Sequence, residues 1–160
     1  MILFTQLTTK ETQDLLAYFL EYVVANMLLP GRIENWVLIA DMAGLNVLSV
    51  PYGMFQEIFN FMQNNYRARL YKGYVLNAPW TFSTVWTAVK KLIEETTALK
   101  MVITSSATDA QILTHINPEQ LETKYGGKAP IIATFWPPAA ASGEFFVDGE
   151  IPSEILTLDD

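Results

Sequence analysis

The spacing of apolar residues predicts a strand and a long helix at the start of the chain. Residues 2–7 (ILFTQL) are a short β-branched and aromatic run that is typical of a strand. Over residues 15–27, apolar side chains then recur every three or four positions, which is the period of one helical face. Thr8 or Thr9 can cap the start of this helix, and Pro30 ends it.

Strand and helix patterns alternate through the middle of the chain. Continuous apolar or β-prone runs predict strands, and amphipathic runs predict helices. The predicted strands are residues 36–40, 70–76 and 100–104; the predicted helices start at Pro51 and cover residues 80–97, with weaker helical pieces at 107–116 and 118–121. This alternation is typical of an α/β fold, in which helices pack against a sheet.

The character of the sequence changes after Gly127. Residues 131–136 are predicted to form an edge strand, residues 137–141 (PPAAA) are typical of a linker, and no clear periodicity follows. We therefore expect one domain over residues 1–136. A Pro/Ala-rich and then acidic tail is expected over residues 137–160.

Composition narrows the possible functions. Apolar residues make up 51% of the chain and charged residues 17%, against about 25% charged in ordinary domains. This apolar excess suits a membrane protein, a buried partner interface or an internal hydrophobic cavity. No stretch reaches the roughly 20 apolar residues that a membrane-spanning helix needs. The N-terminus also lacks the basic start and cleavage site of a secretory signal.

The charge distribution argues against nucleic acid as a partner. The net charge is −7, and six of the seventeen acids lie in residues 144–160, which hold no Lys or Arg. The rest of the chain carries eleven acids against ten bases and lacks the dense basic face of a nucleic-acid-binding protein. The chain has no cysteine, so disulfides, thiolate catalysis and cysteine-ligated zinc are excluded.

No pattern predicts an enzyme. His115 is the single histidine, and no carboxylate lies at metal-ligand spacing from it. The Gly-x-Ser-x-Gly elbow, the phosphate-binding Gly-rich loop and the dinucleotide fingerprint are absent from the sequence. Asp41 follows a predicted strand, where an Asp more often caps a turn than acts in catalysis. We expect no catalytic residue, no metal site and no cofactor, apart from a bound lipid or other hydrophobic ligand.

Five short features, in order from Glu34 onward, carry a resemblance to a known family. They are the apolar strand ending in Asp41 with Gly44 after it; residues 63–66 (QNNY) with Arg69; residues 75–79 (VLNAP) with residues 82–84 (FST); Lys100 at the start of a strand; and residues 121–127 (LETKYGG). In this order they resemble the CRAL-TRIO family, which includes phosphatidylinositol-transfer and tocopherol- or retinaldehyde-binding proteins.

The resemblance implies a mostly parallel sheet flanked by helices, with a hydrophobic pocket on the sheet and a mobile gate helix that closes it. Residues 80–97 correspond to the gate helix. Many family members carry a helical region before the first strand. We expect that region to be lacking here, because the strand pattern begins at residue 2.

The residues expected to bind lipid come from the gate, the strands and two basic positions. In the gate, Phe82, Trp86 and Val89 share one apolar face, and the opposite face, which carries Lys90 and Lys91, could meet a membrane. The resemblance implies that the strands form the pocket floor and that basic residues meet an acidic head group. The expected floor residues are Trp36, Leu38, Tyr74 and Leu76, and the expected head-group residues are Lys100 and Arg69.

Three positions depart from the family pattern and leave two functions open. Ala68 stands where phosphatidylinositol-transfer members have an acid, and Trp36 and Leu38 stand where phosphatidylcholine-binding members have hydroxyl residues. The first hypothesis is the binding, with or without transfer, of one phospholipid or isoprenoid-like ligand in an internal pocket, with transient membrane contact. The second is a filled pocket in a structural subunit or protein-interaction module of a larger complex. We expect a cytoplasmic protein, peripheral to membranes, and an organellar location stays open.

Overall fold

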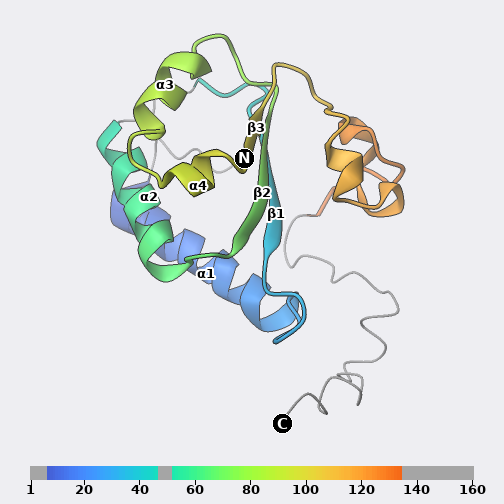
Figure 1. Ribbon diagram of the computed structural model, residues 1–160, viewed down its shortest axis with the longest axis horizontal. Coiled ribbons are helices and arrows are strands. Elements are labelled where there is room, and N and C mark those ends of the chain that lie inside the picture. Colours follow the sequence, from blue (N-terminus) through green and yellow to red (C-terminus); the bar gives the residue numbers. More distant parts are fainter. Residues whose placement is uncertain (1–6, 47–51, 135–160) are drawn as a thin grey trace.

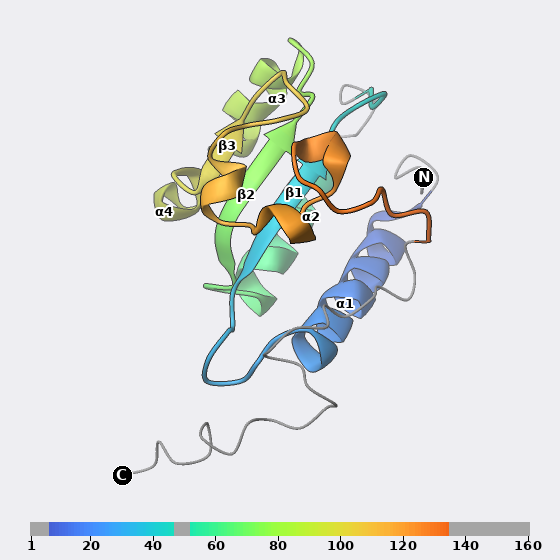
Figure 2. The same ribbon diagram turned by 90° about the vertical axis from the view of Figure 1, so that its right-hand side faces the viewer.

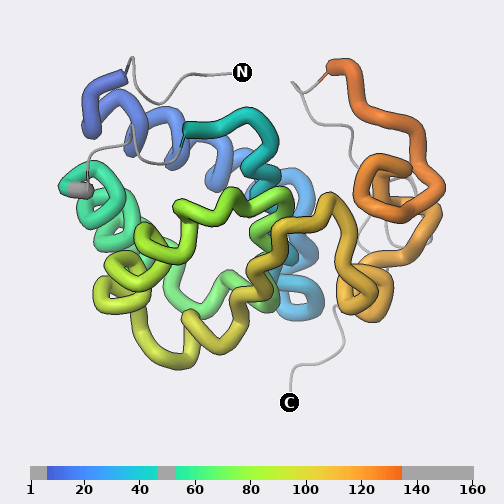
Figure 3. Tube along the Cα trace, turned by 90° about the horizontal axis from the view of Figure 1, so that it is seen from above, coloured from blue at the N-terminus to red at the C-terminus, as the bar shows by residue number. Residues whose placement is uncertain are grey.

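The computed structural model describes residues 7–46 and 52–134. Within these ranges, three parallel strands form a sheet in the order β1 (Trp36–Asp41), β2 (Leu70–Leu76) and β3 (Met101–Ile103). The α-helices on one face are α1 (Thr9–Asn26), α2 (Tyr52–Asn65), α3 (Phe82–Val89) and α4 (Glu95–Ala98) (Figure 1). The 3-10 helices on the other face are η3 (Ile112–Thr114), η4 (Pro118–Gln120) and η5 (Thr123–Tyr125) (Figures 2 and 3).

The predicted α/β class, with a mostly parallel sheet flanked by helices, is confirmed. Several sequence predictions fall outside the described residues. They are most of the first strand, the start of the second helix at Pro51, and the linker and acidic tail.

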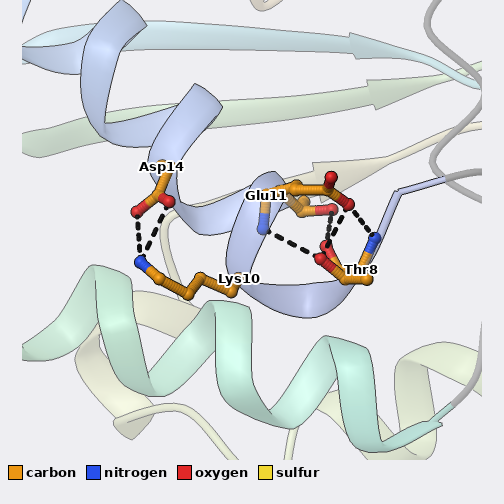
Figure 4. Close-up of polar contacts among 5 residues, drawn as sticks. Thr8, Lys10, Glu11 and Asp14 are labelled. Carbon is orange, nitrogen blue, oxygen red and sulfur yellow. Dashed lines mark hydrogen bonds and ion pairs between the residues drawn. The ribbon is translucent and has the colours of Figure 1, made fainter.

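Helix α1 begins at the predicted position because Thr8 and Glu11 form a capping box (Figure 4). The Thr8 hydroxyl accepts the Glu11 backbone N–H at 3.3 Å, and the Thr8 backbone N–H donates to Glu11 Oε2 at 2.8 Å. These hydrogen bonds, the one from the Thr8 side chain above all, lower the pKa of Glu11. In the same turn, Lys10 forms a salt bridge with Asp14 at 3.0 Å.

The single helix predicted for residues 80–97 is wrong: α3 and α4 are separate helices with a break between them. Gln63 of α2 occupies this break. Its Nε2 donates to the Leu92 carbonyl at 2.9 Å, and its Oε1 accepts the Glu94 backbone N–H at 3.3 Å. The backbone groups at the break are therefore satisfied by a side chain instead of by a continuous helix.

The edge strand predicted for residues 131–136 is also wrong for its described part. Residues 131–134 form no strand. The Ile132 backbone N–H donates to the Glu122 carboxylate at 2.7 Å, so this donor is not available to a neighbouring strand.

Side chains alternate between the two faces of the sheet and form a separate apolar cluster on each. The cluster on the α-helical side includes Ala40, Val75, Phe82, Met101 and Ile103. The cluster under the 3-10 helices includes Tyr74, Leu76, Ile112 and Leu121. The second cluster is the more tightly packed of the two, because three of its large side chains are fully buried.

Two glycines allow the segment with the 3-10 helices to fold back on itself. Gly126 has φ of +93°, a backbone conformation that favours glycine. A Cβ on Gly127 would lie 1.9 Å from the Leu121 carbonyl oxygen, a distance that no side chain tolerates. The glycine pair at the end of the family-like motif therefore has a structural role.

Asp41, at the end of β1, joins three parts of the chain. Its Oδ1 accepts the Ala43 backbone N–H at 2.9 Å and Asn77 Nδ2 at 2.8 Å, and its Oδ2 accepts the Tyr125 hydroxyl at 3.2 Å. The bond to Ala43 confirms that Asp41 caps a turn. The Asn77 hydrogen bond lowers the pKa of Asp41 most; burial opposes it, and the other two bonds add to the lowering.

Replacing Gly127 by Ala should lower the free energy of unfolding by about 1–3 kcal/mol or more, because the methyl group would overlap the Leu121 backbone. Gly53→Ala is the matched control. Gly53 is exposed in α2 with open space around an added Cβ, and helix propensity predicts a gain of up to about 1 kcal/mol there. Urea unfolding measures both variants, and equal stabilities would contradict the close approach at Gly127.

Asp41→Asn should make stability less dependent on pH in the acid range. The folded pKa of Asp41 lies below its unfolded value near 3.8, so the charged carboxylate stabilises the fold above that pH. This contribution is lost as the pH falls through the lowered pKa. The free energy of unfolding of the variant should therefore fall less than that of the wild type between about pH 5 and about pH 2. If urea titrations give the same dependence of the unfolding free energy on pH for the variant and the wild type, Asp41 does not contribute to the acid sensitivity of the fold.

Candidate functional site

The α-helical layer covers its side of the sheet incompletely. Among the described residues of α1 and α2, Met54 is the only buried apolar side chain. The apolar stripe of α1 is half-buried along its length. On the opposite face of the sheet, by contrast, Tyr74, Leu76 and Ile112 are fully buried. The α-helical side therefore retains apolar surface that a ligand can reach.

One row of residues across the sheet shows where this surface lies. Leu38, Gly73 and Met101 are register partners on the three strands and share the α-helical side. Leu38 is 48% exposed, and Gly73 adds no side chain. Met101 occupies the space above Gly73, since its sulfur lies 2.5 Å from the place that a Cβ on that glycine would take. A flexible thioether thus forms the centre of the row.

Two adjoining hollows, of about 290 Å³ and about 570 Å³, lie between α3, α4 and β3. Both are lined by Trp86, Lys90, Glu95 and Ala98; the first also by Leu99 and Met101, and the second also by Thr87, Lys91 and Ile93. We call the two hollows together the α3–α4 groove. The break between the helices makes this groove possible, because it lets α4 run in a different direction from α3 (Figure 1).

The three predicted lid residues divide between the core and the groove. Phe82 and Val89 are buried, and Phe82 stacks on Trp86 with ring centroids 6.5 Å apart. Trp86 is half-buried and lines both hollows. Of the predicted lid, Trp86 is therefore the residue that a ligand in the groove would touch.

The four predicted floor residues do not lie together. Tyr74 and Leu76 belong to the cluster under the 3-10 helices, so the sheet separates them from α3. The reason is strand alternation, because the residue between them on β2 faces the α-helices instead. Leu38 does lie on the α-helical side, and Trp36 is half-buried against Tyr66, with ring centroids 6.1 Å apart.

The two predicted head-group residues donate to backbone carbonyls next to the amino ends of the strands. Lys100 Nζ donates to the Leu70 carbonyl at 2.6 Å, and the Arg69 guanidinium donates to the Glu34 carbonyl at 2.9 Å. An ammonium group has three donors, so Lys100 keeps two for another acceptor. Neither side chain lines the α3–α4 groove, and their contact with a head group stays a prediction.

The α4 wall of the groove was missed by sequence reasoning. Glu95, Ala98 and Leu99 line this wall, but the amphipathic pattern predicts Glu95 in the second half of one long helix and leaves Ala98 and Leu99 just after its end. A signal for the break was present, since Glu94 and Glu95 form an acidic pair, which is typical of the first turn of a new helix.

His115 lies across the sheet from the groove, at the end of η3. Its Nδ1 is 2.8 Å from the Tyr74 hydroxyl and 3.1 Å from the Gln111 carbonyl. Burial, with smaller effects of nearby groups, raises the pKa of Tyr74. In the described ranges, no group of three or more His, Asp or Glu residues could hold a metal ion, and no helix is long and apolar enough to cross a membrane.

Known proteins share this arrangement of sequence and fold. Residues 3–127 match the CRAL/TRIO domain family. The Sec14 cytosolic factor of Schizosaccharomyces pombe is 32% identical over 99 residues, which are 61% of this chain and 35% of that protein. The phosphatidylinositol transfer protein CSR1 of Eremothecium gossypii is 24% identical over 121 residues, which are 76% of this chain and 27% of that protein.

A solved structure gives the same result for the fold. The crystal structure of Sfh5 superposes with a TM-score of 0.50 at 25% sequence identity, over 59% of this chain and 34% of that one. The chain thus spans between 27% and 35% of the length of these three proteins. Because the family match extends from residue 3 through the strands and α3 to Gly127, the chain belongs to the CRAL-TRIO domain family.

Proposed function

We propose that this chain binds one hydrophobic molecule, a phospholipid or another lipid, between the sheet and its α-helical layer, with the α3–α4 groove as the opening. The observation that carries the proposal is the unequal burial of the two sheet faces. Side chains under the 3-10 helices are fully buried, whereas the α1 stripe and Leu38 are not. A Leu38 side chain that is 48% exposed does not fill the space that it faces, which favours a binding site over a filled interior.

Burial of apolar surface can supply the free energy of binding. Each methylene group that leaves water contributes about 0.8 kcal/mol, and the half-buried side chains of α1 lie on the same side of the sheet as Trp86. A lipid ligand is supported by the relatives, one of which is named a phosphatidylinositol transfer protein. We propose binding without catalysis, because the single histidine lies on the far side of the sheet.

Exchange of the ligand with a membrane is part of the same proposal. Leu99, directly after α4, is 74% exposed and lines the groove. An exposed apolar side chain at the mouth of a lipid site can enter the interfacial region of a bilayer. A lipid could then pass between the bilayer and the groove without crossing water, which would make the chain a transfer module.

Trp86→Asp should abolish the retention of lipid while the domain still folds, because it removes the large aromatic surface that lines both hollows and puts a charge beside Ala98 and Met101. Trp80→Asp is the matched control, since Trp80 is 87% exposed and lines neither hollow. Native mass spectrometry of gently purified protein, followed by organic extraction, measures the bound lipid, and circular dichroism checks folding. We expect a stoichiometric adduct on the wild type and on Trp80→Asp, and none on Trp86→Asp.

Because Trp86 also packs on Phe82, Leu99→Asp provides a second test at an exposed groove position. Its retained lipid should fall well below that of the wild type. If both folded variants keep their full lipid content, the groove is not the opening. A wild-type mass without an adduct, unchanged after incubation with mixed lipid vesicles, would refute lipid binding and favour the structural-subunit hypothesis.

A further inference from the structure

Positively charged side chains outnumber negatively charged ones around the α3–α4 groove. Lys90 and Lys91, which follow α3, and Glu95 of α4 line the groove. Among the residues that the structure describes, neither lysine has a salt bridge or a side-chain hydrogen bond, whereas three other lysines pair with carboxylates. The mouth of the groove is therefore net positive in a chain whose net charge is −7.

The neighbouring acid Glu94 does not offset this positive charge. Its carboxylate lies 3.9 Å from the Arg67 guanidinium, and Glu94 lines neither hollow. Lys90 and Lys91 are both exposed, so their ammonium groups act as mobile point charges that can meet an anion at the groove mouth. Glu95 disfavours an anion on the α4 side. The lysine side is thus the favoured place for an anionic group.

Apart from the two lysines, Glu95 and Thr87, the residues that line the groove are apolar, and the groove is small. Trp86, Ala98 and Met101 line it, and the Met101 thioether covers Gly73 on the sheet. The range for small-molecule sites is about 300–1,000 Å³. The first hollow, of about 290 Å³, lies at the lower limit of this range, and the second, of about 570 Å³, lies in its lower half. This space suits one hydrocarbon chain better than the two chains of a diacyl phospholipid.

We propose that the α3–α4 groove binds a single-chain amphiphile with an anionic head group. The hydrocarbon chain lies on Trp86 and Met101, and the head group pairs with Lys90 and Lys91. This ligand class rests on the proposed function, which it narrows. Met101 can adapt to chains of different shape, because its unbranched thioether side chain has three rotatable bonds. The apolar surface supplies affinity, and the lysines supply the preference for an anion.

The test compares oleate with oleyl alcohol, which has the same chain and no charge, on the delipidated full chain. Titration calorimetry below the micelle concentration measures both affinities without any membrane. Exposed ion pairs are worth about 0.2–1 kcal/mol each, so two of them should make the wild type prefer oleate by about twofold to thirtyfold. Lys90→Gln/Lys91→Gln should lose this preference and bind oleyl alcohol as the wild type does.

Two further variants control for net charge. Lys72→Gln removes a lysine that is outside the groove and, within the described residues, also has no salt bridge, so it should keep the preference for oleate. Glu95→Gln removes the opposing acid and should raise the affinity for oleate by about twofold. All four positions are on the surface or half-buried, and circular dichroism verifies that each variant folds.

The outcomes separate this ligand class from the proposed function. The proposed pairing of an anionic head group with the lysines is refuted if the wild type binds the two probes equally. It is also refuted if the preference for oleate survives in Lys90→Gln/Lys91→Gln. Both results leave the proposal of lipid binding in place. If the wild type binds neither probe but takes up phosphatidylinositol from vesicles, the proposal of a ligand with one hydrocarbon chain is refuted. A wild type that binds none of these lipids overturns the ligand class and the proposed function together.

Discussion

The pleated backbone of the three paired strands sends successive side chains to opposite faces of the sheet, and the two faces are covered very differently. Tyr74 and Leu76 go to one face, where the 3-10 segment buries them completely. Leu38 and Met101 go to the other, where the α-helices leave apolar surface accessible. The same strands thus form one wall of a packed core and the floor of the candidate binding site. Because the two lie on opposite faces of the sheet, the site can stay open while the core remains fully packed.

The α-helical layer owes much of its arrangement to polar contacts at its edges. The Tyr66 hydroxyl donates to Glu21 Oε1 at 2.8 Å and ties α1 to the end of α2. Burial and this carboxylate raise the pKa of Tyr66 to about 12, so the hydroxyl remains a donor to Glu21 well above neutral pH. Gln63 makes a second contact, between α2 and the chain that joins α3 to α4. Such contacts hold the helices in place while their inward apolar side chains stay half-buried.

Features that depend on neighbours in sequence were predicted well, and features that depend on distant residues were not. The start of α1 follows from Thr8 and Glu11, three positions apart, and the strands follow from short apolar runs. The break after α3 depends on Gln63, which lies 29 positions before the carbonyl that it contacts. The family resemblance predicts that Tyr74 and Leu76 lie on the pocket floor, and strand alternation in the sequence does not show which face of the sheet the α-helices cover. The sequence does not predict the α4 wall of the groove either, because that wall exists only where the break separates α4 from α3.

Gln63 also determines how the groove would respond to change elsewhere in the chain. One amide group meets both the Leu92 carbonyl and the Glu94 N–H, so the corner between α3 and α4 is set from α2. Among the described residues, α2 contributes none that line the groove. Substitutions in α2 would therefore change the shape of the groove, although every residue that lines the groove stays the same.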